Sequence, residues 1–176
     1  MPETQPWKKE RNAPPEQAAV LLDAGGWSPR SFLLSWWPAL AWAGLIFYMS
    51  TDTFSAEHTG GVLQDLVAWL HLSDSQFQAL HFFIRKTAHF TEYFVFYLLL
   101  YRGIRGPRRG WRWIWGLSAW FVAAAYSALD EIHQAFVASR TASAYDSLLD
   151  SIGALVALIV LYLYFCPPSP PARARE

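Results

Sequence analysis

Three short segments hold the side chains best suited to chemistry, and each lies against or inside a long apolar stretch. The residues are Lys86, His89, Glu92 and Tyr93 in the first segment, Asp130, Glu131, His133 and Gln134 in the second, and Asp146 and Asp150 in the third. Histidine and carboxylates can transfer protons, whereas lysine can bind phosphate. A charge in hydrocarbon costs at least about 2.5 kcal/mol, so such residues call for a partner or a function.

Helical spacing brings polar residues of these segments onto common faces. Arg85, His89 and Glu92 would lie within about 60° of one another on a helix. Asp130 and His133 are three residues apart, and a histidine and a carboxylate at this spacing resemble the metal sites of helical bundles. The neighbouring cations would oppose a metal ion and favour a phosphate or carboxylate ligand instead. We therefore expect no metal ion here, and the sequence identifies no cofactor.

The elements that must position these residues are apolar and long enough to cross a bilayer as helices. They cover residues 32–49, 82–101, 111–129 and 147–165. The chain is 53% hydrophobic and 17% aromatic, with ten Trp, and Trp and Tyr favour the membrane interface. We therefore expect an all-α, polytopic membrane protein whose core is a four-helix transmembrane bundle.

Two further features complete the predicted architecture. Residues 62–70 have the pattern of an amphipathic helix lying on the outer membrane surface. Ser73 with Gln76 matches a capping box, which predicts that the helix leading into the second span starts there. The sequence predicts three regions. They are a disordered cytoplasmic tail over 1–31, the membrane domain over 32–165, and a Pro/Arg-rich cytoplasmic tail over 166–176.

Basic residues determine the predicted orientation. The loop over residues 102–112 contains five Arg, and Lys8, Lys9 and Arg11 precede the first span. Because basic loops stay in the cytoplasm, both termini are predicted to be cytoplasmic in a multi-pass protein of the cell membrane. All three polar segments then lie at the outer ends of their spans, at similar depth. The net charge of zero gives no reason to expect a nucleic-acid partner.

Each polar residue also has a purely structural interpretation. Asp146 follows Ser143 by three positions, so the pair could be a capping box. Lys86 could mark the membrane interface, and His89 could pair only with Glu92. A structural ion network that holds the helices together is therefore the alternative to a functional site.

The same residues resemble the VanZ-like family of small bacterial membrane proteins. The matching pieces are Lys86-x-x-His89-x-x-Glu92-Tyr93, Asp130-Glu131-x-His133-Gln134, Arg140-Thr141, and Asp146 leading through Asp150 to Gly153. Together they cover about residues 84–160, and the family pattern has Asn where this chain has Asp150. The resemblance implies a helical membrane protein, and the family's founding member is linked to resistance to the glycopeptide antibiotic teicoplanin. It implies no established reaction.

The predicted function is that of an outward-facing polar pocket at the cell envelope, binding or modifying an anionic lipid or a lipid-linked cell-wall precursor. The candidate catalytic residues are His89, Glu92, Asp130 and His133. The candidate ligand-binding residues are Lys86, Tyr93, Glu131, Gln134, Arg140, Asp146 and Asp150. The alternative is a non-catalytic structural or envelope-binding protein with a buried ion network. Enzyme activity, the identity of the ligand and assembly into a homo-oligomer stay open.

Overall fold

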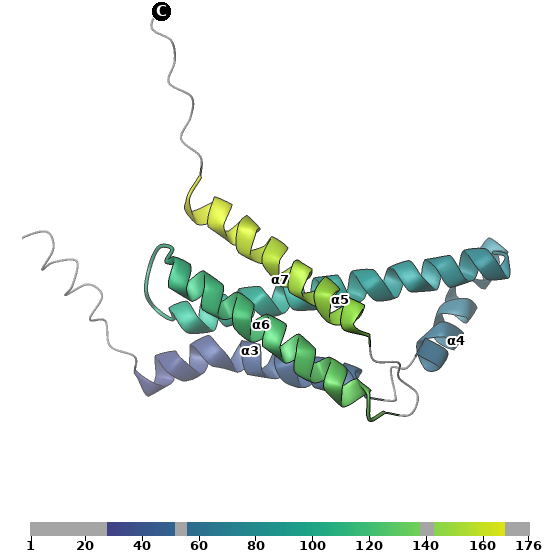
Figure 1. The fold of residues 1–176 in the computed structure, drawn as a ribbon, viewed down its shortest axis with the longest axis horizontal. Coiled ribbons are helices and arrows are strands. Elements are labelled where there is room, and N and C mark those ends of the chain that lie inside the picture. Colours follow the sequence, from purple (N-terminus) through teal and green to yellow (C-terminus); the bar gives the residue numbers. More distant parts are fainter. Residues whose placement is uncertain (1–27, 52–55, 138–142, 168–176) are drawn as a thin grey trace, which may run out of the picture.

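The residues that the structure describes fold into helices (Figure 1). This structure is a computed structural model, and it describes residues 28–51, 56–137 and 143–167. The elements are α3 (Pro29–Met49), α4 (Ala56–Val67), the short 3-10 helix η2 (Ala68–Leu70), α5 (Asp74–Arg105), α6 (Trp113–Gln134) and α7 (Ala144–Phe165). The described part of the chain contains no strand, and the predicted all-α class is confirmed.

Helix α5 begins where the capping box predicted and ends later than expected. The Ser73 side chain accepts a hydrogen bond from the Gln76 backbone, and the Gln76 side chain accepts one from the Ser73 backbone. The helix continues to Arg105, so Arg102 and Arg105 belong to its last turn and not to the following loop. Cations favour the negative end of the helix dipole. Gly106, with a φ of 59°, then ends the helix in a backbone conformation that favours glycine.

The polar residues of the second and third segments also lie inside helices. Asp130 and Gln134 occupy the last turns of α6, which runs five residues beyond the predicted span. Helix α7 starts at Ala144, three residues before the predicted start of the fourth span, so Asp146 lies in its first turn. The two helices therefore bring their polar residues to the same end of the bundle.

Helix α5 is the centre of the bundle, because α3, α6 and α7 all pack against it. Its buried aromatic face, including Tyr93, Phe96 and Tyr97, fills the core. Helix α7 approaches α5 closely at Gly153, where an added Cβ would lie 2.4 Å from the backbone oxygen of Phe90. The first part of α5 extends beyond the other long helices and lies beside α4 (Figure 1).

Two helices have the length and composition of membrane spans. Helices α3 and α7 have mean hydropathies of 1.4 and 2.2 over their apolar segments, of which only 11% and 28% are buried inside the protein. Helix α5 carries charged residues along its length, and α6 carries Trp and Tyr, which lower its mean hydropathy. Hydropathy alone therefore gives two candidate spans among the described residues, and not the four that the sequence predicts. Both helices fit a membrane location.

The outer surface of the bundle is apolar on α6 as well. Phe121 and Leu129 on α6 are 68% and 62% exposed, comparable to Leu40 on α3 at 67%. Large contiguous apolar surfaces mark sites of contact with lipid or with another protein. Helix α6 thus presents to its surroundings the same kind of surface as the two helices that pass the hydropathy test.

Candidate functional site

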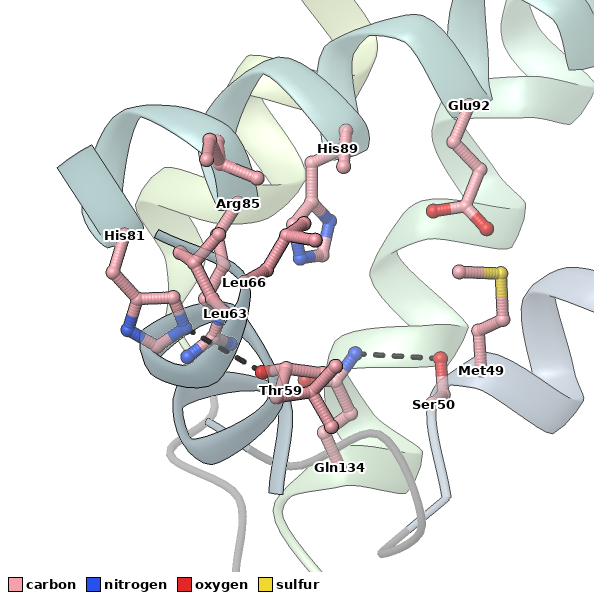
Figure 2. Close-up of a pocket in the computed structure, with 13 residues that line it drawn as sticks. Met49, Ser50, Thr59, Leu63, Leu66, His81, Arg85, His89, Glu92 and Gln134 are labelled. Carbon is pink, nitrogen blue, oxygen red and sulfur yellow. Dashed lines mark hydrogen bonds between the residues drawn. The ribbon is translucent and has the colours of Figure 1, made fainter. Parts of the chain in front are cut away.

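A cavity of about 450 Å³ lies at the end of the bundle where α3 and α6 finish and α4 crosses α5 (Figure 2). Met49 and Ser50 from the end of α3 and Gln134 from the end of α6 contribute to one side. Helix α5 contributes the largest number of polar side chains, and α4 contributes an apolar wall. The cavity therefore joins segments that are distant in the sequence.

The polar wall of the cavity is one face of α5. His81, Arg85, His89 and Glu92 follow one another at spacings of four, four and three residues, which places them along a single helical stripe. Figure 2 shows these four side chains along the α5 ribbon, above Thr59 and Leu63 of α4. The predicted common face of Arg85, His89 and Glu92 is thus present in the structure.

The opposite wall comes from α4. Val62, Leu63 and Leu66 line the cavity, and Val62 and Leu66 remain 71% and 70% exposed to the outside. Thr59 Oγ1 and His81 Nε2, 3.4 Å apart, connect α4 to α5. A helix is therefore present in the predicted region, but α4 begins before residue 62 and the 3-10 helix η2 covers residues 68–70. Its position on the outer membrane surface stays a prediction.

His89 is held against a buried carboxylate. Its Nδ1 lies 3.4 Å from Oδ1 of Asp150 on α7, whose residue is only 1% exposed. The hydroxyl of Ser127 on α6 donates to Oδ2 of the same carboxylate at 2.8 Å. The interpretation that His89 pairs only with Glu92 is therefore wrong. A carboxylate at Nδ1 orients the imidazole and leaves Nε2 as the atom that can exchange a proton or a hydrogen bond with a ligand.

Asp130 belongs to a separate hydrogen-bond group between α3 and α6. The Ser50 hydroxyl donates to its Oδ1 at 2.6 Å, and the Gln134 amide donates to its Oδ2 at 2.9 Å. The Gln134 amide also lies 3.4 Å from the Ser50 hydroxyl, and this contact appears as a dashed line in Figure 2. Asp130 therefore lies behind the cavity wall that Ser50 and Gln134 form, and it ties α3 to α6.

Lys86 faces α7 and does not line the cavity. Its ammonium group donates to the carboxylate of Asp146, and it lies 5.3 Å from the centroid of the Phe82 ring. The capping-box interpretation of Asp146 is wrong, because the side chain of Ser143 caps nothing. The Ser143 backbone N–H instead donates to Oε2 of Glu131 at 2.7 Å, so Glu131 holds the start of α7.

The remaining predicted residues lie apart from the cavity or outside the described residues. His133 packs its ring 4.7 Å from that of Phe47 on α3, and Tyr93 is buried in the core beside Phe96. Arg140 lies outside the described residues, as do most of the two predicted tails. Within the described ranges, no three His, Cys, Asp or Glu side chains are grouped as metal ligands would be.

Three residues that the structure brings into this region were not predicted from the sequence. They are Ser50, His81 and Ser127. Ser127 precedes Asp130 by three residues on the same helix, and Ser50 directly follows the first apolar stretch. Hydroxyl groups are common at helix ends and interiors, so these two positions carry little signal. Arg85 lies on the predicted common face, although the candidate ligand-binding set contains its neighbour Lys86 instead.

The described helices form an apolar bundle with buried polar groups at one end, and two of them fit a membrane location. The family model described as VanZ/LLP1 matches residues 35–165, and the chain belongs to this family. Proteins of this family are membrane proteins, in agreement with the two apolar helices. No curated protein and no solved structure was found to match the chain. The family resemblance predicted from the sequence motifs is therefore confirmed.

Proposed function

We propose that the protein crosses the cell membrane four times, with both termini in the cytoplasm, and that its cavity binds an anionic lipid headgroup at the outer face. Helix α5 can cross despite its charges, because α3, α6 and α7 pack against it and its Lys86 and His89 contact the carboxylates of Asp146 and Asp150 on α7. The apolar exposed surface of α6 supports a fourth crossing. The arginine-rich end then faces the cytoplasm.

Reporter fusions test this topology. A fusion after Gly106 should report a cytoplasmic position, and a fusion after Ser139 should report an external one. Two fusions in the same compartment would refute the four-span arrangement. Fusion after Ser28, directly in front of α3, provides an independent cytoplasmic reference.

The observation that carries the binding proposal is the pairing of a polar wall with an apolar wall in one cavity. Arg85 and His89 offer donors to a phosphate, and guanidinium groups bind phosphate through charge-assisted hydrogen bonds. Val62 and Leu66 on α4 provide apolar surface for the first methylene groups of a lipid chain. A ligand with a phosphate next to a hydrocarbon chain matches both walls at once.

The size of the cavity further restricts which ligands can bind in it. Pockets of about 300–1,000 Å³ hold drug-sized ligands, and this cavity lies in the lower half of that range. A glycopeptide antibiotic is several times larger than such a ligand. The cavity therefore suits the phosphate and adjoining groups of a lipid or lipid-linked cell-wall precursor, and any effect on glycopeptide resistance would arise through the envelope lipid.

Binding can be measured with a polyprenyl phosphate in phosphatidylcholine nanodiscs containing the full-length protein. Removing one charged hydrogen bond costs about 1.5–3 kcal/mol, so Arg85→Gln should weaken binding by tenfold or more. Lys86→Gln removes a neighbouring charge that faces Asp146 instead, and it should weaken binding much less. Equal losses in both variants, at unchanged thermal stability, would refute a cavity-based site.

A second function, catalysis at the same cavity, is favoured by the contact between His89 and the buried Asp150. His89 would act as the general acid–base, with Asp150 orienting its ring. If His89→Gln abolishes a cellular phenotype such as teicoplanin tolerance while the purified variant still binds the polyprenyl phosphate, the cavity performs chemistry. If phenotype and binding are lost in parallel, the protein acts by binding.

A structural network is favoured by the Lys86–Asp146 pair and by the hydrogen bonds of Asp130. The first contact joins α5 to α7 away from the cavity, and the second joins α3 to α6 behind the cavity wall that Ser50 and Gln134 form. If variants of these residues alter only stability, whereas Arg85→Gln alters only binding, the network holds together the helices that form the binding cavity. If polyprenyl phosphate does not bind at all, the network is the whole role of the polar residues.

A further inference from the structure

Charge is distributed unevenly along the bundle axis. The arginines at the end opposite the cavity are Arg30, Arg102, Arg105, Arg108, Arg109 and Arg112. The carboxylate side chains that the structure describes lie toward the other end, on α4, on α5 up to Glu92, in the last turns of α6 and in the first turns of α7. The described part of the arginine end therefore carries a strong positive charge.

Aromatic rings hold several of these guanidinium groups in place. Arg108 and Arg112 lie 4.5 and 5.4 Å from the centroid of the Trp115 ring, and Arg105 lies 5.5 Å from that of Phe165 on α7. Stacking on a ring fixes the plane of a guanidinium and leaves its edge available for hydrogen bonds. Trp and Tyr rings at such a position also match the depth of lipid headgroups.

Two of the arginines contribute to the fold itself. Arg102 donates to the backbone oxygen of Leu34 on α3 at 3.0 Å, and Arg108 donates to that of Arg105 at 2.9 Å. Both acceptors are neutral carbonyl groups. Arg105 differs, because its Nε–H is buried and makes no hydrogen bond to another described residue. Arg109 follows four residues later in the sequence and is exposed.

We propose that this end of the bundle binds the phosphate of an anionic phospholipid in the inner leaflet, with Arg105 as the main contact and Arg109 as the outer one. The site is separate from the outer cavity and independent of what the cavity binds, whereas its place in the inner leaflet rests on the proposed topology. Two features select an anionic lipid over a soluble phosphate. The guanidinium of Arg105 stacks on Phe165, at the end of an apolar helix, and the exposed side chains of the neighbouring Trp113 and Tyr164 offer apolar surface for acyl chains.

The test uses a phosphatidylglycerol that carries a photoreactive group on its headgroup, mixed into phosphatidylcholine nanodiscs with the full-length protein. Each arginine near an anionic membrane surface strengthens binding by about fivefold. Crosslinks should therefore form within residues 105–115, and their yield should fall about fivefold in Arg105→Gln and again in Arg109→Gln. Arg85→Gln, at the opposite end, should leave the yield in this segment unchanged.

Several outcomes would overturn the proposal. They are crosslinks confined to the cavity end, equal yields in Arg109→Gln and the unmodified protein, and complete competition by inorganic phosphate at a concentration equal to that of the lipid. Arg105→Lys adds a second check, because lysine keeps the charge but cannot stack as a plane, and an intermediate yield supports the stacked geometry. Arg109 is exposed, so Arg109→Gln keeps the test valid if Arg105→Gln fails to fold. Failure of polyprenyl phosphate to bind the cavity would leave this result unaffected.

Discussion

Replacing Gly153 by alanine should force α5 and α7 apart. The added Cβ would lie 2.4 Å from the backbone oxygen of Phe90, and Cβ atoms essentially never come closer than 3.0 Å to another heavy atom. The obstacle is backbone, so no side-chain rotation can relieve it. The helices must therefore separate locally by about 0.6 Å or more, which is the difference between these two distances.

The expected cost follows from comparison with a second glycine. Overpacking a well-packed interface costs about 1–3 kcal/mol. Alanine also stabilises a helix by about 1 kcal/mol relative to glycine, and this gain offsets part of the cost of overpacking. At Gly44 on α3 an added Cβ meets no atom within 4 Å, so Gly44→Ala receives the gain alone. The difference between the two variants should therefore be about 1–3 kcal/mol, with Gly153→Ala the less stable.

Unfolding by sodium dodecyl sulfate in mixed micelles, followed by far-UV circular dichroism, measures this difference. Because His89 directly precedes Phe90, the separation of 3.4 Å between His89 Nδ1 and Asp150 Oδ1 should also increase in Gly153→Ala. Binding of polyprenyl phosphate should then weaken in Gly153→Ala and stay unchanged in Gly44→Ala. Equal unfolding midpoints for the two variants would refute the close approach of α5 and α7.

Two other substitutions test the polar contacts between helices. Ser50→Ala removes a buried donor from the Asp130 carboxylate and should lower the free energy of unfolding by about 1.5–3 kcal/mol. Unfolding by sodium dodecyl sulfate measures this loss, and a loss below about 0.5 kcal/mol would contradict the hydrogen bond between Ser50 and Asp130. Lys86→Glu places a second carboxylate beside Asp146 and should destabilise the protein, whereas adding Asp146→Lys should restore about half or more of the loss. A double variant no more stable than Lys86→Glu would show that the two side chains do not interact.

The helices could be predicted from the sequence because their signals are local. The Ser73 capping box sets the start of α5, and long, mainly apolar stretches define α3 and α7. The predicted bounds failed mainly at helix ends, as at Arg105, where polar residues continue a helix beyond its apolar part. Local sequence patterns therefore predict which residues are helical better than they predict the residue at which a helix ends.

The rotation of α5 could not be predicted in the same way. Arg85 and Lys86 are adjacent, so they point about 100° apart, and only one of them can face the cavity. The choice depends on how α5 packs against α7, which the contact of Gly153 with Phe90 determines. The partner of Asp130 was missed for a similar reason, because Ser50 is eighty residues away in the sequence.

Helix α5 also has a consequence for how the protein responds to its bilayer. Its 32 residues span about 48 Å, whereas the hydrocarbon core is about 30 Å thick and the 21 or 22 residues of the other long helices match it closely. The excess length of α5 stands at the cavity end, where α4 rests beside it (Figure 1). In the proposed four-span arrangement, a thicker bilayer would therefore submerge α4 and the cavity mouth, and a thinner one would lift both into water, at a modest energy per ångström of mismatch. Under that topology, access to the cavity should vary with the acyl-chain length of the surrounding lipid.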